Sequence, residues 1–99
     1  MTSASEKEPA AAGEQDLPEI DFQTFVLSLG HSTLVHLGDA PCAADGSRSI
    51  NLPLARQTID LLSLLQNKTR GNLTGEEERA LHQVLYDLRM RYVEVARER

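Results

Sequence analysis

The sequence predicts an all-α fold of three helices, in which the second and third form an antiparallel hairpin and the first packs across it. Apolar side chains recur at steps of three and four residues in three segments, 21–37, 52–70 and 75–97. A residue that commonly caps helices stands at the start of each segment, and a glycine follows the first two. Together these signals define one small helical domain over residues 21–97.

The leading segment, residues 1–20, differs in composition from the rest of the chain. Residues 1–21 hold six acids and one base, so the whole formal charge of −5 lies there and residues 22–99 are neutral. The segment buries too little apolar surface to offset its ordering entropy, so we predict a disordered acidic tail, solvating rather than binding. The neutral helical region argues against DNA as a partner, because duplex-DNA binders usually carry a basic patch.

The first helix is expected over 21–37, with Asp21 as its N-cap and Gly38 as its C-terminal glycine. Small side chains at Ser28, Gly30 and Ser32 mark a stretch where another backbone can approach closely. The predicted core face consists of Phe22, Phe25, Val26, Leu29, Thr33 and His36.

The second helix is expected over 52–70, with Asn51 as its cap and Pro53 in its first turn. The loop before it, 38–50, is long for a helical bundle; we favour a crossover that spans the domain over a functional loop. The polar side of the helix contains Arg56, Asp60, Ser63 and Asn67. The predicted core side contains Leu54, Thr58, Leu61, Leu62, Leu65 and Thr69.

The third helix, 75–97, starts with a capping box formed by Thr74 and Glu77. Its main apolar stripe contains Leu81, Val84, Leu85, Leu88, Tyr92 and Val95. A second stripe, about 140° around the helix, contains His82, Tyr86, Met90 and Val93. A helix with two apolar stripes packs on two partners, and the second partner is either the first helix or another copy of the chain. Small cores are marginal alone, which favours a homo-oligomer with this second stripe as its interface.

Three sequence blocks together resemble a known family. They are F-x-x-F-V-L-S-L-x-x-S-x-L-V-H-L-G from Phe22, L-A-R-Q-T-I-D-L-L-x-L-L-x-x-K-T-R-G-N-L-T-x-E-E from Leu54, and L-Y-D-L-R-M-R-Y-V-E from Leu85. Over about residues 20–95 the chain resembles the bacterial family called domain of unknown function 1844. The resemblance implies a small, all-helical, cytoplasmic bacterial protein, and it implies no activity and no catalytic or ligand-binding residues.

No arrangement of residues in the sequence points to an enzyme. His31 and His36 are five residues apart and point away from each other on a helix, and no pair of cysteines or histidines has zinc-ligand spacing. Cys42 lies in the loop with no neighbouring base, and no glycine-rich phosphate loop is present. We therefore expect no catalytic residue, no metal and no cofactor.

Basic residues form two groups that support an alternative function. Lys68, Arg70 and Arg79 cluster around the turn between the second and third helices, where turn and cap chemistry already explains the spacing. Arg89 and Arg91 lie further along the third helix, and Arg89 is placed to bridge to a carboxylate such as Asp60. Either group is a candidate contact for RNA, the ribosome or an acidic partner.

The sequence thus predicts a non-enzymatic protein-interaction or self-assembly module with a protein partner still to be identified. The alternative is an accessory factor of translation or RNA metabolism that uses the basic residues. No apolar run reaches the ~18 residues of a membrane span. The acidic start lacks the basic and apolar regions of a signal peptide, so we expect a cytoplasmic location.

Overall fold

The computed structural model describes residues 19–98, and within them it contains three α-helices and no strand. They are α1 (Phe22–His36), α2 (Leu52–Lys68) and α3 (Gly75–Arg97). The helices expected over 21–37 and 52–70 are shorter by one or two residues at their ends, and α3 has the expected bounds. Residues 1–18 of the predicted acidic tail lie outside the described residues, and Glu19 and Ile20 next to them are exposed.

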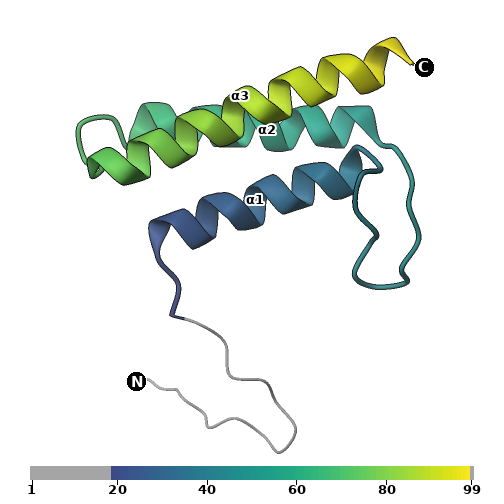
Figure 1. Ribbon diagram of the computed structural model, residues 1–99, viewed down its shortest axis with the longest axis horizontal. Helices are drawn as coiled ribbons and strands as arrows, with labels where there is room; N and C mark the ends of the chain where they lie inside the picture. The colour runs from purple at the N-terminus through teal and green to yellow at the C-terminus, as the bar shows by residue number, and fades with distance from the viewer. Residues whose placement is uncertain (1–18, 99) are drawn as a thin grey trace, which may run out of the picture.

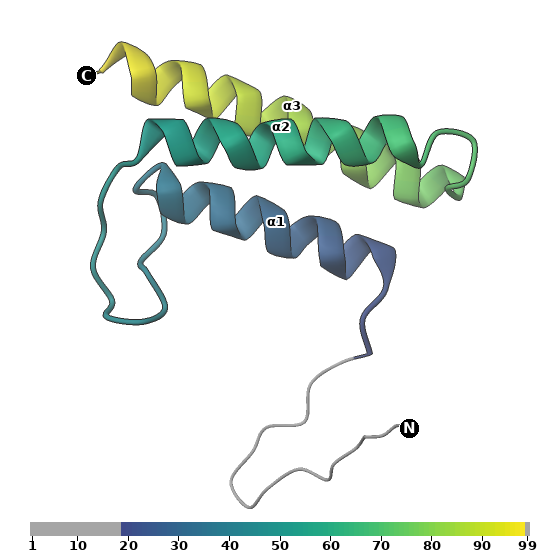
Figure 2. The same cartoon turned by 180° about the vertical axis from the view of Figure 1, so that it is seen from behind.

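Each helix packs against both others, so the fold is a three-helix arrangement around one small core. Figures 1 and 2 show α2 and α3 side by side, running in opposite directions on either side of a short turn. The same directions follow from the packing, because Ala55 near the start of α2 clusters with Val95 near the end of α3. α1 lies along the other two helices, with its C-terminal end near the start of α2.

The loop between α1 and α2 does not span the domain, so the expectation of a crossover is wrong. The Asn51 N–H donates to the His36 carbonyl oxygen at 2.7 Å, which holds the end of α1 next to the start of α2. The intervening residues leave this end of the bundle and return to it, as Figure 1 shows. Gly38 makes the exit turn with a φ of +81°, a backbone conformation that glycine adopts without strain.

The predicted N-caps are present at all three helices. An oxygen of Asp21 accepts a hydrogen bond from the Thr24 N–H at 2.7 Å, and Asn51 caps α2 in the same way. Thr74 and Glu77 form a reciprocal capping box at the start of α3. These bonds satisfy amide groups that a helix start otherwise leaves without partners.

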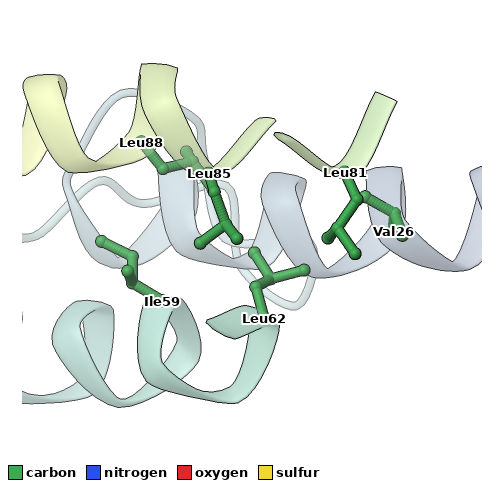
Figure 3. Packing of buried hydrophobic residues seen from close by; sticks show 6 residues of the cluster. All are labelled: Val26, Ile59, Leu62, Leu81, Leu85 and Leu88. Carbon is green, nitrogen blue, oxygen red and sulfur yellow. The ribbon is translucent and has the colours of Figure 1, made fainter. Parts of the chain in front are cut away.

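The core is small and comes mainly from α2 and α3. Figure 3 shows the main cluster, in which the side chains of the three helices point toward one another. Its members are Val26, Ile59, Leu62, Leu81, Leu85 and Leu88. A second cluster at the other end joins Leu37, Ala55 and Val95, with Tyr92 packed against both clusters. The predicted main stripe of α3 therefore faces the core.

The predicted core face of α2 is rotated from the real one. Leu62 is buried as predicted, but the other buried residues are Ala55 and Ile59, and Leu54 and Leu61 are 38% and 44% exposed. The helix α2 contacts α1 on one side and α3 on the other, so its buried residues lie between these two contact sides. Alanine contributes little to an apolar pattern, yet Ala55 is fully buried in a cluster with Leu37 and Val95.

The first helix needs a smaller correction, because Val26 and Thr33 of its predicted face are buried. Val26, Gly30 and Thr33 are buried, whereas Phe25 is 40% exposed and His36 is half-buried. The expected close approach at Gly30 is present, and the neighbour is α3. A Cβ atom at this position would lie 3.3 Å from Cγ1 of Val84 and 3.9 Å from Cδ1 of Leu88.

Candidate interaction surfaces

The second stripe of α3 remains exposed. Tyr86, Met90 and Val93 are 58%, 49% and 43% exposed, and His82 is also exposed. α1 packs on another side of α3, where Gly30 meets Val84, so the first helix is not the partner of this stripe. We call these residues the α3 face: His82, Tyr86, Met90 and Val93.

Arginines stand at both ends of the α3 face. Arg79 lies seven residues before Tyr86 and Arg97 lies seven residues after Met90, so both occupy the same side of the helix. Both side chains are exposed, and among residues 19–98 neither forms a hydrogen bond or ion pair within the chain. The α3 face is therefore apolar in its middle and positively charged at its ends.

A second apolar surface lies along α1 and α2. On α1, Leu27 and Leu34 mark the side that meets α3, because they line a groove together with Val84. On α2, Ser63 marks that side, because it accepts a hydrogen bond from Arg89 of α3. Phe25 lies on the opposite side of α1, and Leu54 and Leu61 lie on the opposite side of α2. With Leu64, which is 55% exposed, they form what we call the α1–α2 face: Phe25, Leu54, Leu61 and Leu64.

The α1–α2 face is almost free of charge. Residues 22–36 contain no Asp, Glu, Lys or Arg, and in α2 the charged pair Arg56 and Asp60 lines a hollow on the α3 side beside Tyr92. Lys68 stands at the end of α2. Sequence reasoning missed this surface because it assigned Phe25, Leu54 and Leu61 to the core. The absence of charge from α1 is the signal that could have indicated it.

The candidate polar residues do not form one surface. Arg89 turns toward α2, where its Nη2 donates to the Ser63 hydroxyl at 3.2 Å. The expected bridge to Asp60 is therefore wrong, and a neutral hydroxyl one turn further along α2 takes its place. Arg91 points to the opposite side of α3, toward the loop after α1. A common RNA-binding use of these arginines stays a prediction.

Arg91 joins α3 to the loop that follows α1. Its guanidinium donates to both carboxylate oxygens of Asp39, at 2.7 and 2.9 Å, and to Glu94 at 2.9 Å. The two parallel bonds to Asp39 are the strong geometry for an arginine and a carboxylate. They hold the pKa of the Asp39 carboxyl below its usual value, and the same contacts raise the pKa of Arg91. This ion pair fixes the exit of α1 against α3.

The Asp39–Arg91 pair gives a test in acid. Because folding lowers the Asp39 pKa, its contribution to stability is complete above the unfolded value of 3.8 and is lost as pH falls below it. We expect Asp39→Asn to lower the Tm at pH 7 and to lose less Tm than the wild type between about pH 5 and pH 2. Circular dichroism melts across this range measure the slope of Tm against pH for both proteins. Equal slopes for the two proteins would contradict the assignment.

A cavity of about 470 Å³ opens at the turn between α2 and α3. Arg70 and Arg79 stand at it together with His82 and Glu78, and Leu73 and Leu81 supply apolar wall. Arg70 also donates to Asn67 at 2.8 Å, which orients its guanidinium. Of the basic residues considered from sequence, Arg70 and Arg79 are thus brought to one cavity, next to the first residue of the α3 face.

The described residues show no metal centre: within 19–98, no group of three His, Cys, Asp or Glu side chains is close enough to hold an ion. Cys42 is a free, half-buried thiol in the loop between α1 and α2. No described helix combines the length and the apolar character needed to cross a membrane. The expectations of no catalytic residue and no cofactor stay predictions.

Comparison with known proteins places the chain in one family. The family model called domain of unknown function 1844 (DUF1844) matches residues 19–94, which include α1, α2 and nearly all of α3. No curated protein and no solved structure showed significant similarity to the chain. The chain therefore belongs to the DUF1844 family.

Proposed function

We propose that this chain is a non-enzymatic protein-interaction module that self-associates through the α1–α2 face. The observation that carries the proposal is the exposure of four large apolar side chains on an almost uncharged surface of two adjacent helices. Exposed apolar patches of this kind mark protein contacts more often than isolated apolar side chains do. The proposal places the module in the cytoplasm of a bacterial cell, in line with the composition and the family resemblance.

A second copy of the chain is the occupant that suits this face best. A symmetric dimer places each residue of a surface against the same surface of its partner, so like charges near the centre are costly. The α1–α2 face avoids this cost because α1 has no formally charged residue. At about 1.5 Å per residue, the exposed leucines from Leu54 to Leu64 cover about 15 Å of α2, and Phe25 of α1 widens the apolar surface.

The α3 face is less suited to self-association. If two α3 faces pair in antiparallel fashion, Arg79 of one copy lies near Arg97 of the other. If they pair in parallel, each arginine faces the same arginine of the other copy. Both arrangements oppose like charges at the ends of a short apolar stripe, which disfavours pairing. We therefore assign self-association to the α1–α2 face instead of the α3 face expected from sequence.

The small core supports an oligomer. Nine apolar residues are buried among the described residues, and Leu54, Leu61 and Leu64 remain partly exposed on a single helix. Domains of this size have little apolar burial to offset their conformational entropy, and association is one common way to add burial.

The test is the charge-introducing variant Leu61→Glu. Each dimer would contain two buried glutamates in place of leucines, at a cost of at least about 3 kcal/mol, which weakens the dimer about 100-fold or more. Sedimentation velocity of the full chain is expected to show a wild-type mass above the 10.9 kDa of one chain and a Leu61→Glu mass equal to it.

Two controls locate the effect. Asn72→Glu adds the same charge at an exposed position of the turn that follows α2, away from the α1–α2 face, and Met90→Glu adds it at the centre of the α3 face. Both are expected to keep the wild-type mass. A wild-type chain that is monomeric at every concentration contradicts the proposal. So does dissociation by Met90→Glu with Leu61→Glu remaining associated, since that result assigns the interface to α3.

A further inference from the structure

We propose that the α3 face, together with the cavity at the α2–α3 turn, binds an acidic amphipathic helix of a partner protein. The inference rests on the proposed function in one respect, that the chain acts by protein contact, and it names the chemistry of the partner. It does not depend on which surface joins two copies of the chain.

The apolar part of the surface has the length of a helix-binding stripe. Tyr86, Met90 and Val93 follow one another along one exposed side of α3. They follow the three- and four-residue steps that match the apolar side of another helix. From Arg79 to Arg97 the surface spans about 27 Å at the rise of an α-helix, which corresponds to a partner helix of about 18 residues.

The charges on this surface favour a partner with acidic ends. Arg79 and Arg97 bracket the stripe and have no partner among residues 19–98. Two of the acids nearest the stripe are already engaged, because Asp87 accepts from Gln83 at 2.9 Å and Glu94 accepts from Arg91 at 2.9 Å. The charges at the two ends of the apolar stripe are therefore positive.

The cavity adds a place for one anchor side chain. Leu73 and Leu81 supply apolar wall, and Arg70 and Arg79 stand beside it. An apolar side chain of the partner can enter the cavity while an adjacent carboxylate meets a guanidinium, a pairing that arginine geometry favours. The cavity adjoins His82, so it continues the α3 face toward the turn.

The acids around the surface disfavour RNA as the ligand. Glu78 lies at the cavity, and Asp87 directly follows Tyr86 on α3. A phosphate backbone carries a charge at every nucleotide and would meet these carboxylates. A helix with a few acidic residues can place them only at the arginines. The surface also offers a single exposed aromatic ring, Tyr86, for stacking on bases.

The test uses two designed peptides and the full chain. Both peptides are fluorescein-labelled helices of about 18 residues with one leucine stripe. One has glutamates at its ends and the other has lysines there. Fluorescence anisotropy is expected to show binding of the glutamate peptide and at least about tenfold weaker binding of the lysine peptide. Arg79→Glu and Arg97→Glu are each expected to weaken binding of the glutamate peptide about tenfold or more.

The control for charge is Arg48→Glu, which changes net charge equally but lies in the loop after α1, where Arg48 donates to the Asp39 carbonyl oxygen. This variant and Leu61→Glu are expected to bind the glutamate peptide as the wild type does. Binding by Leu61→Glu separates this inference from the self-association proposal, since each can fail alone. Equal binding of both peptides, no binding of the glutamate peptide, or its displacement by single-stranded RNA overturns the inference.

Discussion

Replacing Leu62 by alanine is expected to lower the free energy of unfolding by about 2–5 kcal/mol. The Leu62 side chain of α2 is fully buried in the main cluster, which joins residues of all three helices. Its removal takes away apolar contacts and leaves a cavity that the three helices cannot fully close. For a domain of this size such a loss lowers the Tm by about 10 °C or more.

The matched control is Leu27→Ala, the same chemical change at a side chain that is 60% exposed. It is expected to change the free energy of unfolding by less than about 1 kcal/mol. Urea denaturation at one fixed protein concentration measures both variants, because self-association makes stability depend on concentration. Equal effects of the two variants would show that the core is not where the structure places it.

Gly30→Leu is expected to separate α1 from α3 and to cost at least about 3 kcal/mol, at the upper end of what overpacking costs. A Cβ atom at position 30 already lies 3.3 Å from Val84, so the further atoms of a leucine have no space unless α1 moves. The expected result is a low thermal midpoint and loss of the near-ultraviolet signal of tyrosine, with much helix retained.

The control is Ser28→Leu, at an exposed position half a turn away on the same helix. It adds the same side chain where nothing obstructs it, so stability is expected to change by no more than about 0.5 kcal/mol. The pair Gly30→Ala and Val84→Ala tests the contact itself. Removing the Val84 side chain is expected to restore part of any stability that an alanine at position 30 loses.

Local signals predicted the helices well. Asp21, Asn51 and Thr74 cap helices through their own side chains, and such bonds depend on a few neighbouring residues. The core face of α3 was also predictable, because its leucines repeat at helical spacing beside polar residues. The family assignment followed from three sequence blocks and agrees with the family model.

The rotation of α1 and α2 was not predictable in the same way. α2 has apolar residues on more than one side, and the choice of which side is buried depends on how α1 and α3 pack against it. The pattern of leucines favoured Leu54 and Leu61, whereas the packed core selected Ala55 and Ile59. The route of the loop and the Arg89–Ser63 bond likewise depend on contacts between distant parts of the chain.

The candidate surfaces divide along the same line. The α3 face was predictable because its second stripe lies well away from the core stripe on a single helix. The α1–α2 face was not, since it combines residues of two helices whose relative position only tertiary structure defines. The pairing of Asp39 with Arg91 was not predictable either, because 52 residues separate the two side chains in sequence.

The most direct test of self-association through the α1–α2 face is a dilution series followed by methyl NMR of the full chain. Dilution from about 1 mM to about 10 µM is expected to shift the methyl signals of Leu54, Leu61 and Leu64. Met90 and Val93 are expected to keep their shifts throughout. Shifts confined to Met90 and Val93, or no change in any methyl signal, would contradict self-association through the α1–α2 face.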